Sequence, residues 1–467
     1  MKLKKTLLLL GVTILIIIIG SHWVSKKVSN RDKEITQVDR KKSEELTTET
    51  IPPIDDENFI DTSDTIRVAL HTTGFETLLH SEVRVTCNTK YIITYKNHKE
   101  EKKAGEMSSF SQLNQKITIT PKYKKGRLTI LSIKRNENNP SYRGKLTLYP
   151  KESKITVVNE LSMEEYLYGV VPSEMPVSYG QEALKVQAVC ARTYAMAQKN
   201  AKHYEAYHAD VVDSTASQVY KNTQEDGRAN QAVRDTKGKI LMAGDTIAST
   251  YFFSTSFGYT TNVKDVWYQK RNEKSPIYLT GQFQGKENFT LNLKREKDFK
   301  AFINDSESYD TFEKNDTWYR WKITENLLDI AKTLEKQYPM DMKKIGVLKK
   351  IAIIERGVGG VVKICKIKGT KGSFLIEKEN AIRNALAVSG TKILGQNKKS
   401  MVVSGLLPSG YFYITQKKGV ITFHGGGFGH GVGMSQTGAM RMAEAGYHWE
   451  EILQHYFPET YIQECYT

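Results

Sequence analysis

The sequence predicts an α+β fold, in which an N-terminal membrane anchor and a stalk precede a mixed body with a β-rich part and a helix-centred part. Two patterns indicate this. From Thr65 onward, short runs such as KYIITYK and GRLTILSIKR alternate between apolar and polar residues and are rich in β-branched residues, which is typical of strands. Further along, the longer segment QEALKVQAVCARTYAMAQK has small and apolar residues at helical spacing.

The first 24 residues are predicted to form the anchor. Three lysines precede the apolar run TLLLLGVTILIIIIG, which continues more weakly to Val24. This length is just enough to cross a hydrocarbon core of about 30 Å. The alternative is a cleaved signal peptide, which has the same charged start but normally ends in a small-x-small cleavage site, and this run has none. We expect a single-pass anchor in the cell membrane, with the large body on the extracytoplasmic, cell-wall side.

The overall charge indicates a polyanionic environment. The 467 residues include 68 Lys and Arg against 52 Asp and Glu, which gives a net charge of +16. Nucleic acid, an anionic membrane face and an acidic cell-wall polymer all fit this charge, but an exported body does not meet nucleic acid. The four cysteines lie far apart and form no C-x-x-C pair, so neither a structural zinc site nor a redox dithiol is indicated. A disulfide is not required in a chain of this length.

Composition divides the chain into six segments. Residues 25–64 are polar, charged and interrupted by proline, so they cannot bury a core and are expected to form a flexible stalk. Residues 271–347 are more polar than their neighbours. The predicted segments are the anchor 1–24, the linker 25–64, the β-rich part 65–158, the helical part 159–270, an inserted or peripheral region 271–347 and a C-terminal part 348–467 with a glycine-rich motif.

Two capping boxes indicate where helices begin. Ser162 is followed three residues later by Glu165, and Ser178 by Gln181, so we expect a helix over MEEYLYG and a longer one from Gln181. The longer helix carries a stripe of small or apolar residues that lets a neighbouring element approach closely, which places it at the centre of its domain. The stripe consists of Leu184, Ala188, Ala191 and Ala195.

The stretch FHGGGFGHGVGMSQTGA has glycine at every second position from Gly427 to Gly433. It contains neither G-x-x-x-x-G-K-[ST] nor G-x-G-x-x-G, so the familiar phosphate-binding loops are not indicated. In an extended chain the spacing places the glycines on one face and larger side chains on the other. A bare strand face admits either a packed backbone or a ligand, and the pattern alone leaves both interpretations open.

Glu174 lies in VVPSEMPVSYG, which we expect to be a stiff connector between the two capped helices because Pro172 and Pro176 bracket the glutamate. Partial burial there raises the pKa of a carboxyl group, which a general acid at neutral pH requires. The alternative is a local role, either in capping or in an ion pair with Arg192 or Lys185. From the pattern alone, the local role is favoured.

Signatures of other enzyme classes are missing. The sequence has no H-E-x-x-H of a zinc peptidase and no G-x-S-x-G of a serine hydrolase. Cys190 sits inside the alanine-rich helix, where a buried thiol is expected. The hydroxyls of Ser254, Thr255 and Ser256 suit hydrogen bonds to a sugar, and they suit a turn equally well.

Several stretches together resemble the SpoIID/LytB family of bacterial cell-wall proteins. They occur in the family's order and cover nearly everything from residue 65 to the C-terminus, and the SEMP and GFGHGVGMSQ blocks are highly specific. The resemblance implies a sporulation-type peptidoglycan lytic transglycosylase that cleaves glycan strands already stripped of stem peptides. The matching stretches are TIRVAL, YRGKLTLYP, VVNELSMEEYLYGVVPSEMP, EALKVQAVCARTYA, STSFGYTTNVKDVW and GGGFGHGVGMSQTGAMRMAEAGYHWEEILQHYF.

The resemblance also implies roles for individual residues. In that family the glutamate of the E-M-P motif is the catalytic acid/base, and here it is Glu174. We expect the glycine run to form a wall of the glycan groove. Motif membership and residue type assign five further residues to the groove, where they bind sugar or support the acid: Arg192, Gln218, Ser256, His430 and Gln436.

Cofactors and partners follow from the same resemblance. Some family members hold zinc with cysteines and histidines in the loop after the ARTYA helix, but here that loop offers His203 and His208 and no cysteine, so we expect no metal and no cofactor. A peptidoglycan amidase that strips stem peptides is the implied partner. The alternative function is that of a non-catalytic amidase enhancer or wall-binding adaptor of the LytB type. The intact S-E-M-P motif favours the enzyme, because an adaptor needs no positioned acid.

Overall fold

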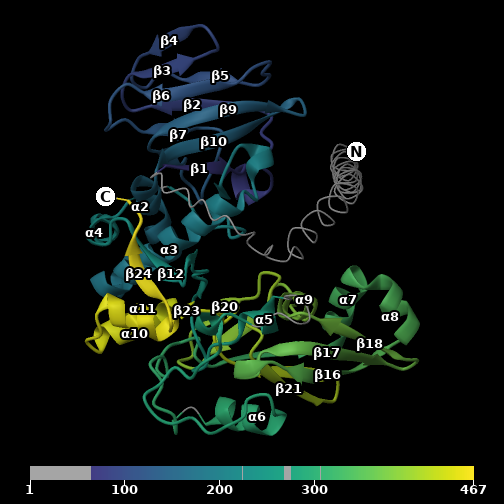
Figure 1. Ribbon diagram of the computed structural model, residues 1–467. Coiled ribbons are helices and arrows are strands. Elements are labelled where there is room, and N and C mark those ends of the chain that lie inside the picture. Colours follow the sequence, from purple (N-terminus) through teal and green to yellow (C-terminus); the bar gives the residue numbers. More distant parts are fainter. Residues whose placement is uncertain (1–64, 223–224, 268–274, 306, 467) are drawn as a thin grey trace, which may run out of the picture. The chain divides into compact units, whose positions relative to one another are not determined.

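The computed structural model describes residues 65–222, 225–267, 275–305 and 307–466. The predicted anchor and the whole of the predicted stalk, residues 25–64, fall outside these residues. Within the described ranges, no helix is long and apolar enough to cross a membrane. The body contains helices and many strands, which confirms the mixed α+β class (Figure 1).

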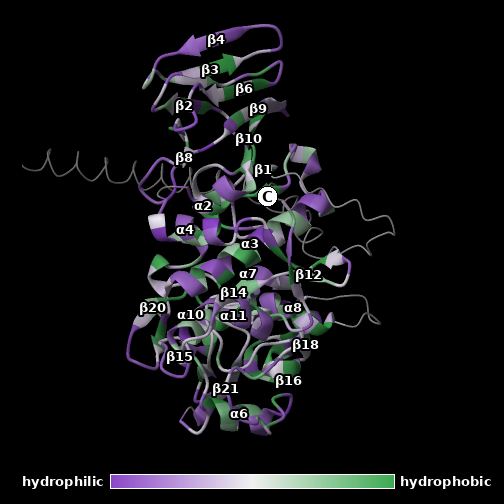
Figure 2. Ribbon diagram, turned by 60° about the vertical axis from the view of Figure 1, so that its left-hand side comes forward, coloured by the Kyte–Doolittle hydropathy of each residue, from purple (hydrophilic) through white to green (hydrophobic). Residues whose placement is uncertain are grey.

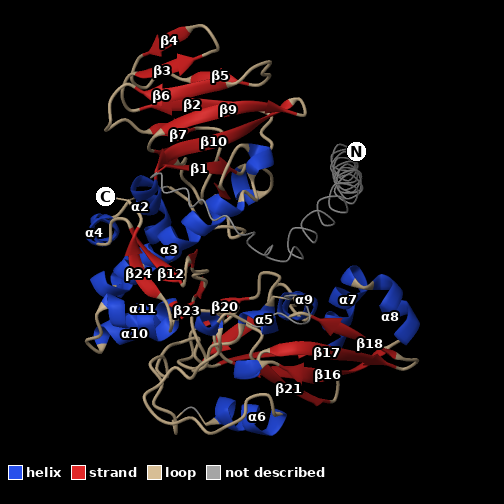
Figure 3. Cartoon of the chain, in the orientation of Figure 1, coloured by secondary structure: helices blue, strands red, loops and turns tan. Residues whose placement is uncertain are grey.

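The β-rich part consists of two sheets that share one hydrophobic core. A seven-stranded sheet has the order β11-β1-β10-β9-β6-β3-β4, and a four-stranded sheet has the order β5-β2-β7-β8 (Figure 3). Alternate residues of β3, Tyr91 and Ile93, are buried, as the period-two pattern predicts. The edge strand β4, with the sequence KEEK, has no buried residue and is hydrophilic along its length (Figure 2). The strands are β1 (Thr65–Leu70), β2 (Val83–Cys87), β3 (Tyr91–Thr94), β4 (Lys99–Lys102), β5 (Ser108–Phe110), β6 (Ile117–Pro121), β7 (Leu128–Ile130), β8 (Ser141–Tyr142), β9 (Lys145–Lys151), β10 (Lys154–Ser162) and β11 (Val211–Val212).

The helix-centred part is built around α3 (Gln181–Ala201), which confirms the predicted central helix. All four residues of the small-residue stripe are fully buried, and Cys190 on the same helix is a buried free thiol, as predicted. Helices from the C-terminal end of the chain pack on α3, so residues more than 200 positions apart meet there. The neighbours of α3 include α2 (Met163–Glu174), α4 (Gly227–Asp235), β12 (Lys239–Ala243), α10 (Gln436–Glu444) and α11 (Trp449–Tyr456).

Only one of the two predicted helix caps is present. Ser162 is the N-cap of α2, and its hydroxyl oxygen accepts a hydrogen bond from the Glu165 N–H (3.3 Å), as predicted. The cap predicted at Ser178 is wrong, because Gly180 is the N-cap of α3. The φ angle of Gly180 is 89°, a conformation that favours glycine. Ser178 lies instead in the short 3-10 turn Val177–Tyr179 that links α2 to α3.

A second hydrophobic core lies in the C-terminal half of the chain. It is enclosed by a five-stranded sheet with the order β20-β19-β15-β22-β21, a three-stranded sheet with the order β16-β17-β18, and helices α7 to α9. Strand β15 lies at the centre of the larger sheet, although it belongs to the segment that the sequence predicts to be inserted or peripheral. Trp321 and Ile323 of this strand are buried in the core, so this part of the segment is integrated into the fold.

The remaining elements complete the chain. Strand β24 pairs antiparallel with β12, which fixes the C-terminal end to the helical part, and β14 pairs in parallel with β23. Their bounds, with those of the second core, are β13 (Thr246–Ile247), β14 (Phe252–Phe253), α5 (Val263–Val266), α6 (Glu296–Asn304), β15 (Trp321–Asn326), α7 (Leu327–Gln337), α8 (Pro339–Ile345), β16 (Leu348–Arg356), β17 (Val362–Gly369), β18 (Ser373–Glu377), α9 (Glu379–Ala385), β19 (Lys392–Gly395), β20 (Ser400–Val402), β21 (Phe412–Lys417), β22 (Val420–Gly425), β23 (Met434–Ser435) and β24 (Tyr461–Glu464).

Candidate active site

Glu174 is the last residue of α2, so the helix continues five residues beyond the predicted segment MEEYLYG, and the prediction that Glu174 lies in a connector is wrong. The helix continues through Pro172, and the chain turns extended at Met175, whose N–H donates to the Val171 carbonyl oxygen (3.0 Å). A proline in the last turn of a helix removes one backbone donor and discourages further helix. The glutamate is therefore presented from the end of a rigid element.

The Glu174 carboxyl group is half-buried and is held by one backbone donor. Its Oε1 atom accepts a hydrogen bond from the Val219 N–H at 2.5 Å. Burial raises the pKa of this carboxyl to about 7, while the Val219 hydrogen bond and the positive charge of Lys221 oppose the rise. Near neutral pH the group therefore exists in both protonation states.

The ion pairs that the sequence offers as an alternative for Glu174 do not form. Lys185 pairs with Glu182 (2.8 Å), and Arg192 pairs with Glu164 (2.7 Å). The local-role interpretation through these two residues is therefore wrong. Among the described residues no ion pair holds the Glu174 carboxyl group, and a carboxyl group with a raised pKa is then available for proton transfer.

Gln436 supports the acid through the backbone. Its Nε2 atom donates to the Glu174 carbonyl oxygen (3.1 Å) and to Oε1 of Gln187 on α3 (3.2 Å). Gln436 is the first residue of α10, so this side chain joins the end of α2, the middle of α3 and the start of α10. The sequence prediction that Gln436 belongs to the site agrees with this position, and its side-chain amide bonds the main chain of the acid rather than its carboxyl group.

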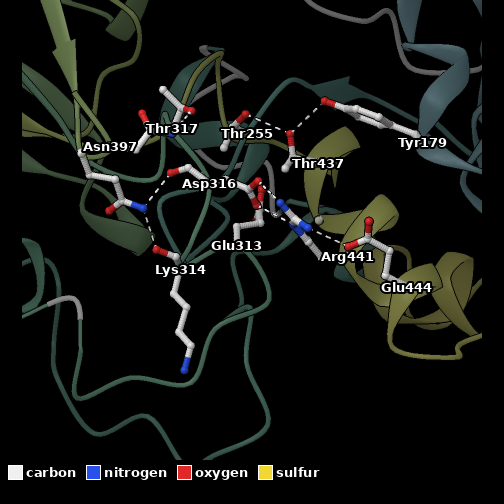
Figure 4. Close-up of polar contacts among 12 residues, drawn as sticks. Tyr179, Thr255, Glu313, Lys314, Asp316, Thr317, Asn397, Thr437, Arg441 and Glu444 are labelled. Carbon is white, nitrogen blue, oxygen red and sulfur yellow. Dashed lines mark hydrogen bonds and ion pairs between the residues drawn. The ribbon is translucent and has the colours of Figure 1, made fainter. Parts of the chain in front are cut away.

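A row of hydroxyl groups continues from this point (Figure 4). The Tyr179 and Thr437 hydroxyl oxygens lie 3.4 Å apart, and the Thr437 and Thr255 oxygens lie 3.1 Å apart. Ser254 extends the row, 3.2 Å from Thr255. Tyr179 and Ser254 are half-buried, whereas the two threonines are buried. Hydroxyl groups both donate and accept hydrogen bonds, so the exposed ends of this row match the hydroxyls of a sugar.

Gln218 and Arg192 are too deeply buried to meet a ligand in this structure. Gln218 is 1% exposed, accepts from the Tyr166 hydroxyl (3.2 Å) and donates to the Ala191 carbonyl oxygen (3.2 Å). It precedes Val219, whose N–H holds the acid, so Gln218 fixes that backbone. Arg192 is 0% exposed and binds the Glu164 carboxylate through two nitrogens, at 2.8 and 2.7 Å. Through these contacts Gln218 and Arg192 stabilise the fold, and their burial does not agree with the predicted contact with sugar.

Ser256 and His430 also use their polar atoms internally. Ser256 is 1% exposed, and its hydroxyl oxygen accepts from the Gly258 N–H (2.9 Å). His430 donates from Nε2 to the Phe252 carbonyl oxygen (3.0 Å), and its Nδ1 accepts from the Val432 N–H (3.1 Å). Burial lowers the pKa of His430 to about 4, so the ring is neutral at physiological pH. His430 contacts the site's surface through its ring, which packs 4.9 Å from that of the partly exposed Trp267.

The glycine run does not form an extended strand, so that prediction is wrong. The alternate glycines from Gly427 to Gly433 have φ angles of 75°, 110°, 78° and 72°, a region that glycine enters without strain. A Cβ at Gly431 would lie 1.9 Å from the Tyr411 hydroxyl oxygen, and one at Gly433 would lie 2.3 Å from the Tyr251 carbonyl oxygen. The glycines therefore allow close internal packing, the first of the two interpretations that the pattern left open.

Three contributors were missed by the sequence analysis. Tyr179 and Thr437 lie within five residues of predicted site residues and carry hydroxyls, so a search along the motifs finds them. The Val219 N–H leaves no trace in the sequence, because any residue except proline supplies a backbone donor.

The helical part of this site matches a known family. Residues 151–242, which include Glu174, match the family model described as stage II sporulation protein (SpoIID). This match confirms the predicted resemblance to the SpoIID family. Residues 261–433 match a second model, described as a domain of unknown function (DUF8618), which covers the buried residues of the second core and the alternating glycines from Gly427 to Gly433.

Individual relatives carry two kinds of name. The chain is 28% identical over 301 residues to the amidase enhancer of Bacillus subtilis (strain 168), a match that covers 63% of this chain and 40% of that protein. It is 28% identical over 332 residues to the stage II sporulation protein D of Bacillus amyloliquefaciens, which covers 66% of this chain and 76% of that protein. The stage II sporulation protein D of Bacillus subtilis (strain 168) is also 28% identical, over 331 residues. The chain thus matches well under half the length of the amidase enhancer.

Proposed function

We propose that this protein is a peptidoglycan lytic transglycosylase with Glu174 as its single acid/base. The observation that carries the proposal is the Glu174 carboxyl group, half-buried at a helix end with a pKa raised to about 7. A group with this pKa donates a proton efficiently near pH 7 and, once ionised, accepts one. The substrate class, glycan strands stripped of stem peptides, follows from the family resemblance.

The proposed chemistry needs one carboxyl group. Ordinary glycosidases use two, one to protonate the leaving oxygen and one to attack or to activate water. In the transglycosylase reaction the C6 hydroxyl of muramic acid attacks C1 of its own ring as the bond from C1 to the leaving oxygen breaks. Glu174 gives its proton to the leaving oxygen and takes the proton of the attacking hydroxyl. The products are a 1,6-anhydro end and a free hydroxyl, and no water is consumed.

The surroundings of Glu174 agree with this chemistry. Within the described part of the chain, the groups that oppose the raised Glu174 pKa are the Val219 N–H and Lys221, and a second carboxyl group is not among the causes of the shift. The half-buried hydroxyls of Tyr179 and Ser254 and the partly exposed ring of Trp267 are available for polar and stacking contacts with sugars. The row from Tyr179 to Ser254 defines the floor of the proposed groove.

The proposal extends to location and partner. The predicted anchor would hold the body at the cell membrane on the wall side, and a peptidoglycan amidase would supply the stripped strands. The second candidate function is that of an amidase enhancer, because one relative carries that name. In that case the chain would bind the cell wall or an amidase without cleaving glycan strands.

One assay separates these functions. An amidase is incubated with intact peptidoglycan, and the release of stem peptides is measured with the full-length chain or its Glu174→Gln variant. An enhancer stimulates the amidase equally in both forms, because Gln preserves the shape of the side chain. A transglycosylase yields anhydro ends, and these disappear in the Glu174→Gln variant. The control is Glu182→Gln, which changes a carboxyl group that pairs with Lys185.

A further inference from the structure

Glu313 is a fully buried carboxyl group that the proposed reaction does not use. It lies in a turn within residues 261–433, the segment matched by the domain of unknown function, and its side chain is 0% exposed. The groups around it are hydrogen-bond donors and one further carboxylate, that of Asp316. A buried carboxyl group without a cation is strongly destabilised when ionised, so this environment favours the neutral form.

One oxygen of Glu313 connects two segments of the active site. Oε1 accepts from the Ser435 hydroxyl (2.6 Å) and from the Ser256 N–H (2.8 Å). Ser435 is the N-cap of α10, and its hydroxyl oxygen in turn accepts from the Gly438 N–H (3.2 Å). Glu313 therefore fixes both the loop that carries Ser254 and Thr255 and the helix start that presents Gln436 and Thr437. Figure 4 shows Glu313 together with Thr255 and Thr437.

The other oxygen of Glu313 has no hydrogen-bond partner among the described residues. The hydroxyl of Tyr456, on α11, is likewise unpaired there. Both atoms face Gly438, because an ideal Cβ on this glycine would lie 3.2 Å from Glu313 Oε2 and 2.0 Å from the Tyr456 hydroxyl oxygen. Since Oε1 already accepts two donors, Oε2 is the atom that carries the proton of a neutral carboxyl group.

We propose that Glu313 is a positioning residue that acts in its protonated form, tying the loop at Ser256 to the start of α10 and so holding Gln436 and Thr437 beside Glu174. The role of Glu313 in catalysis rests on the proposed function, whereas its burial in the neutral form does not. Glu313 reaches the acid only through Ser435 and Gln436, and it touches no reacting atom.

The charges around Glu313 support its protonated state. Burial and, to a smaller extent, the nearby Asp316 carboxylate raise the pKa of Glu313 to about 8, while the hydrogen bonds from Ser435 and Ser256 oppose the rise. Arg441 on α10 is paired with Asp316 (2.5 Å) and Glu444 (2.7 Å), and no cation is among the groups that shift the pKa of Glu313. From α11 the facing group is Tyr456, which is neutral in this range because burial raises its pKa well above the ordinary value.

The first test measures the unfolding temperature of the full-length chain from about pH 5 to pH 8. In the unfolded chain Glu313 ionises near its ordinary pKa, while the folded chain retains the proton up to about pH 8. The unfolded state therefore binds fewer protons in this range, and stability falls as pH rises. We expect the unfolding temperature of the wild type to fall relative to Glu313→Gln, which has no proton to lose. Glu444→Gln, a surface change on α10, should run parallel to the wild type. Parallel curves for the wild type and Glu313→Gln would overturn the proposal.

The second test compares cleavage of peptide-free glycan at pH 7. Glu313→Gln keeps the acceptor oxygen and places an amide donor at the second position, so we expect kcat within about twofold of the wild type. Glu313→Ala removes the acceptor of the Ser435 hydroxyl and leaves the Ser256 N–H only its contact with the Ser435 hydroxyl oxygen (3.1 Å). We expect kcat to fall about tenfold, as for one lost buried hydrogen bond. A Gln variant as impaired as the Ala variant would show that an ionised carboxylate is required, and it would refute the proposal that Glu313 acts in its protonated form. If the wild type cleaves no glycan, the proposed function fails, and the unfolding series still decides whether Glu313 is a buried neutral group.

Discussion

Replacing Arg192 tests whether this residue supports the fold or binds the substrate. Its guanidinium group is fully buried and makes hydrogen bonds to both oxygens of Glu164 and to the carbonyl oxygens of Lys239 (3.1 Å) and Val233 (3.3 Å). Arg192→Ala removes all of them and leaves the Glu164 carboxylate, whose side chain is 14% exposed, without its cation. Breaking a buried ion pair in this way destabilises a protein by about 3–5 kcal/mol.

The assay is urea unfolding of the full-length chain, followed by circular dichroism, for Arg192→Ala, Arg192→Lys, Arg192→Met, Glu164→Gln and the double variant Arg192→Met, Glu164→Gln. Lysine keeps the charge but cannot form the two-pronged contact, so it should recover only part of the loss. The double variant should be more stable than the sum of the single losses predicts, with an interaction energy of about 1–3 kcal/mol. The reasoning is refuted if Arg192→Ala unfolds within about 1 kcal/mol of the wild type, the size expected of an exposed pair, while losing glycan binding.

Three further predictions concern the site. Because protonated Glu174 is the proposed acid, kcat/KM for glycan cleavage should fall as pH rises through about 7, and a profile that stays flat to alkaline pH would contradict this role. Gln436→Ala removes the donor to the Glu174 carbonyl oxygen and should lower kcat by up to about tenfold with little change in KM, measured by steady-state kinetics; an unchanged kcat would show that the contact is dispensable. Gly433→Ala should destabilise the fold by about 1–3 kcal/mol in thermal unfolding, because the added Cβ meets the Tyr251 carbonyl oxygen, and more than Gly446→Ala, which has a φ angle of 91° but open space around it. Equal losses in the two glycine variants would mean that the close approach at Gly433 has no effect.

The elements with strong local patterns could be predicted from the sequence. The period-two strands of the β-rich part and the small-residue stripe of α3 depend on burial of one face, and the buried residues are those that the pattern selects. The cap at Ser178 was mispredicted because Ser-x-x-Gln resembles a capping box, while Gly180, two residues later, reaches the φ angle of 89° that the tight link requires. The alternating glycines were assigned to an extended strand for a related reason. A chain that needs a positive φ angle at every second residue has glycine at the same spacing as one bare face of a strand.

The position of Glu174 was visible in its motif, but its environment was not. Val219 is 45 residues away and Gln436 is 262 residues away along the chain, and only the packing of α10 against α3 brings Gln436 to the acid. Arg192 and Gln218 were predicted to bind sugar or to support the acid, and their burial, which argues against sugar contact, depends on tertiary packing. Glu313 carries no sequence signal at all, because a lone glutamate in a polar segment normally faces solvent.

The most direct test of the central claim is the chemistry of the ends that the protein leaves on glycan. Peptide-free glycan strands are incubated with the full-length chain, with Glu174→Gln or with Glu182→Gln, and the products are analysed by mass spectrometry. The proposed function predicts 1,6-anhydro-muramic acid ends with the wild type and with Glu182→Gln, and none with Glu174→Gln. Strands that remain intact while the wild type still binds them would contradict a transglycosylase. Reducing ends without the anhydro ring would instead show that water attacks, and a single-carboxyl mechanism would then be wrong.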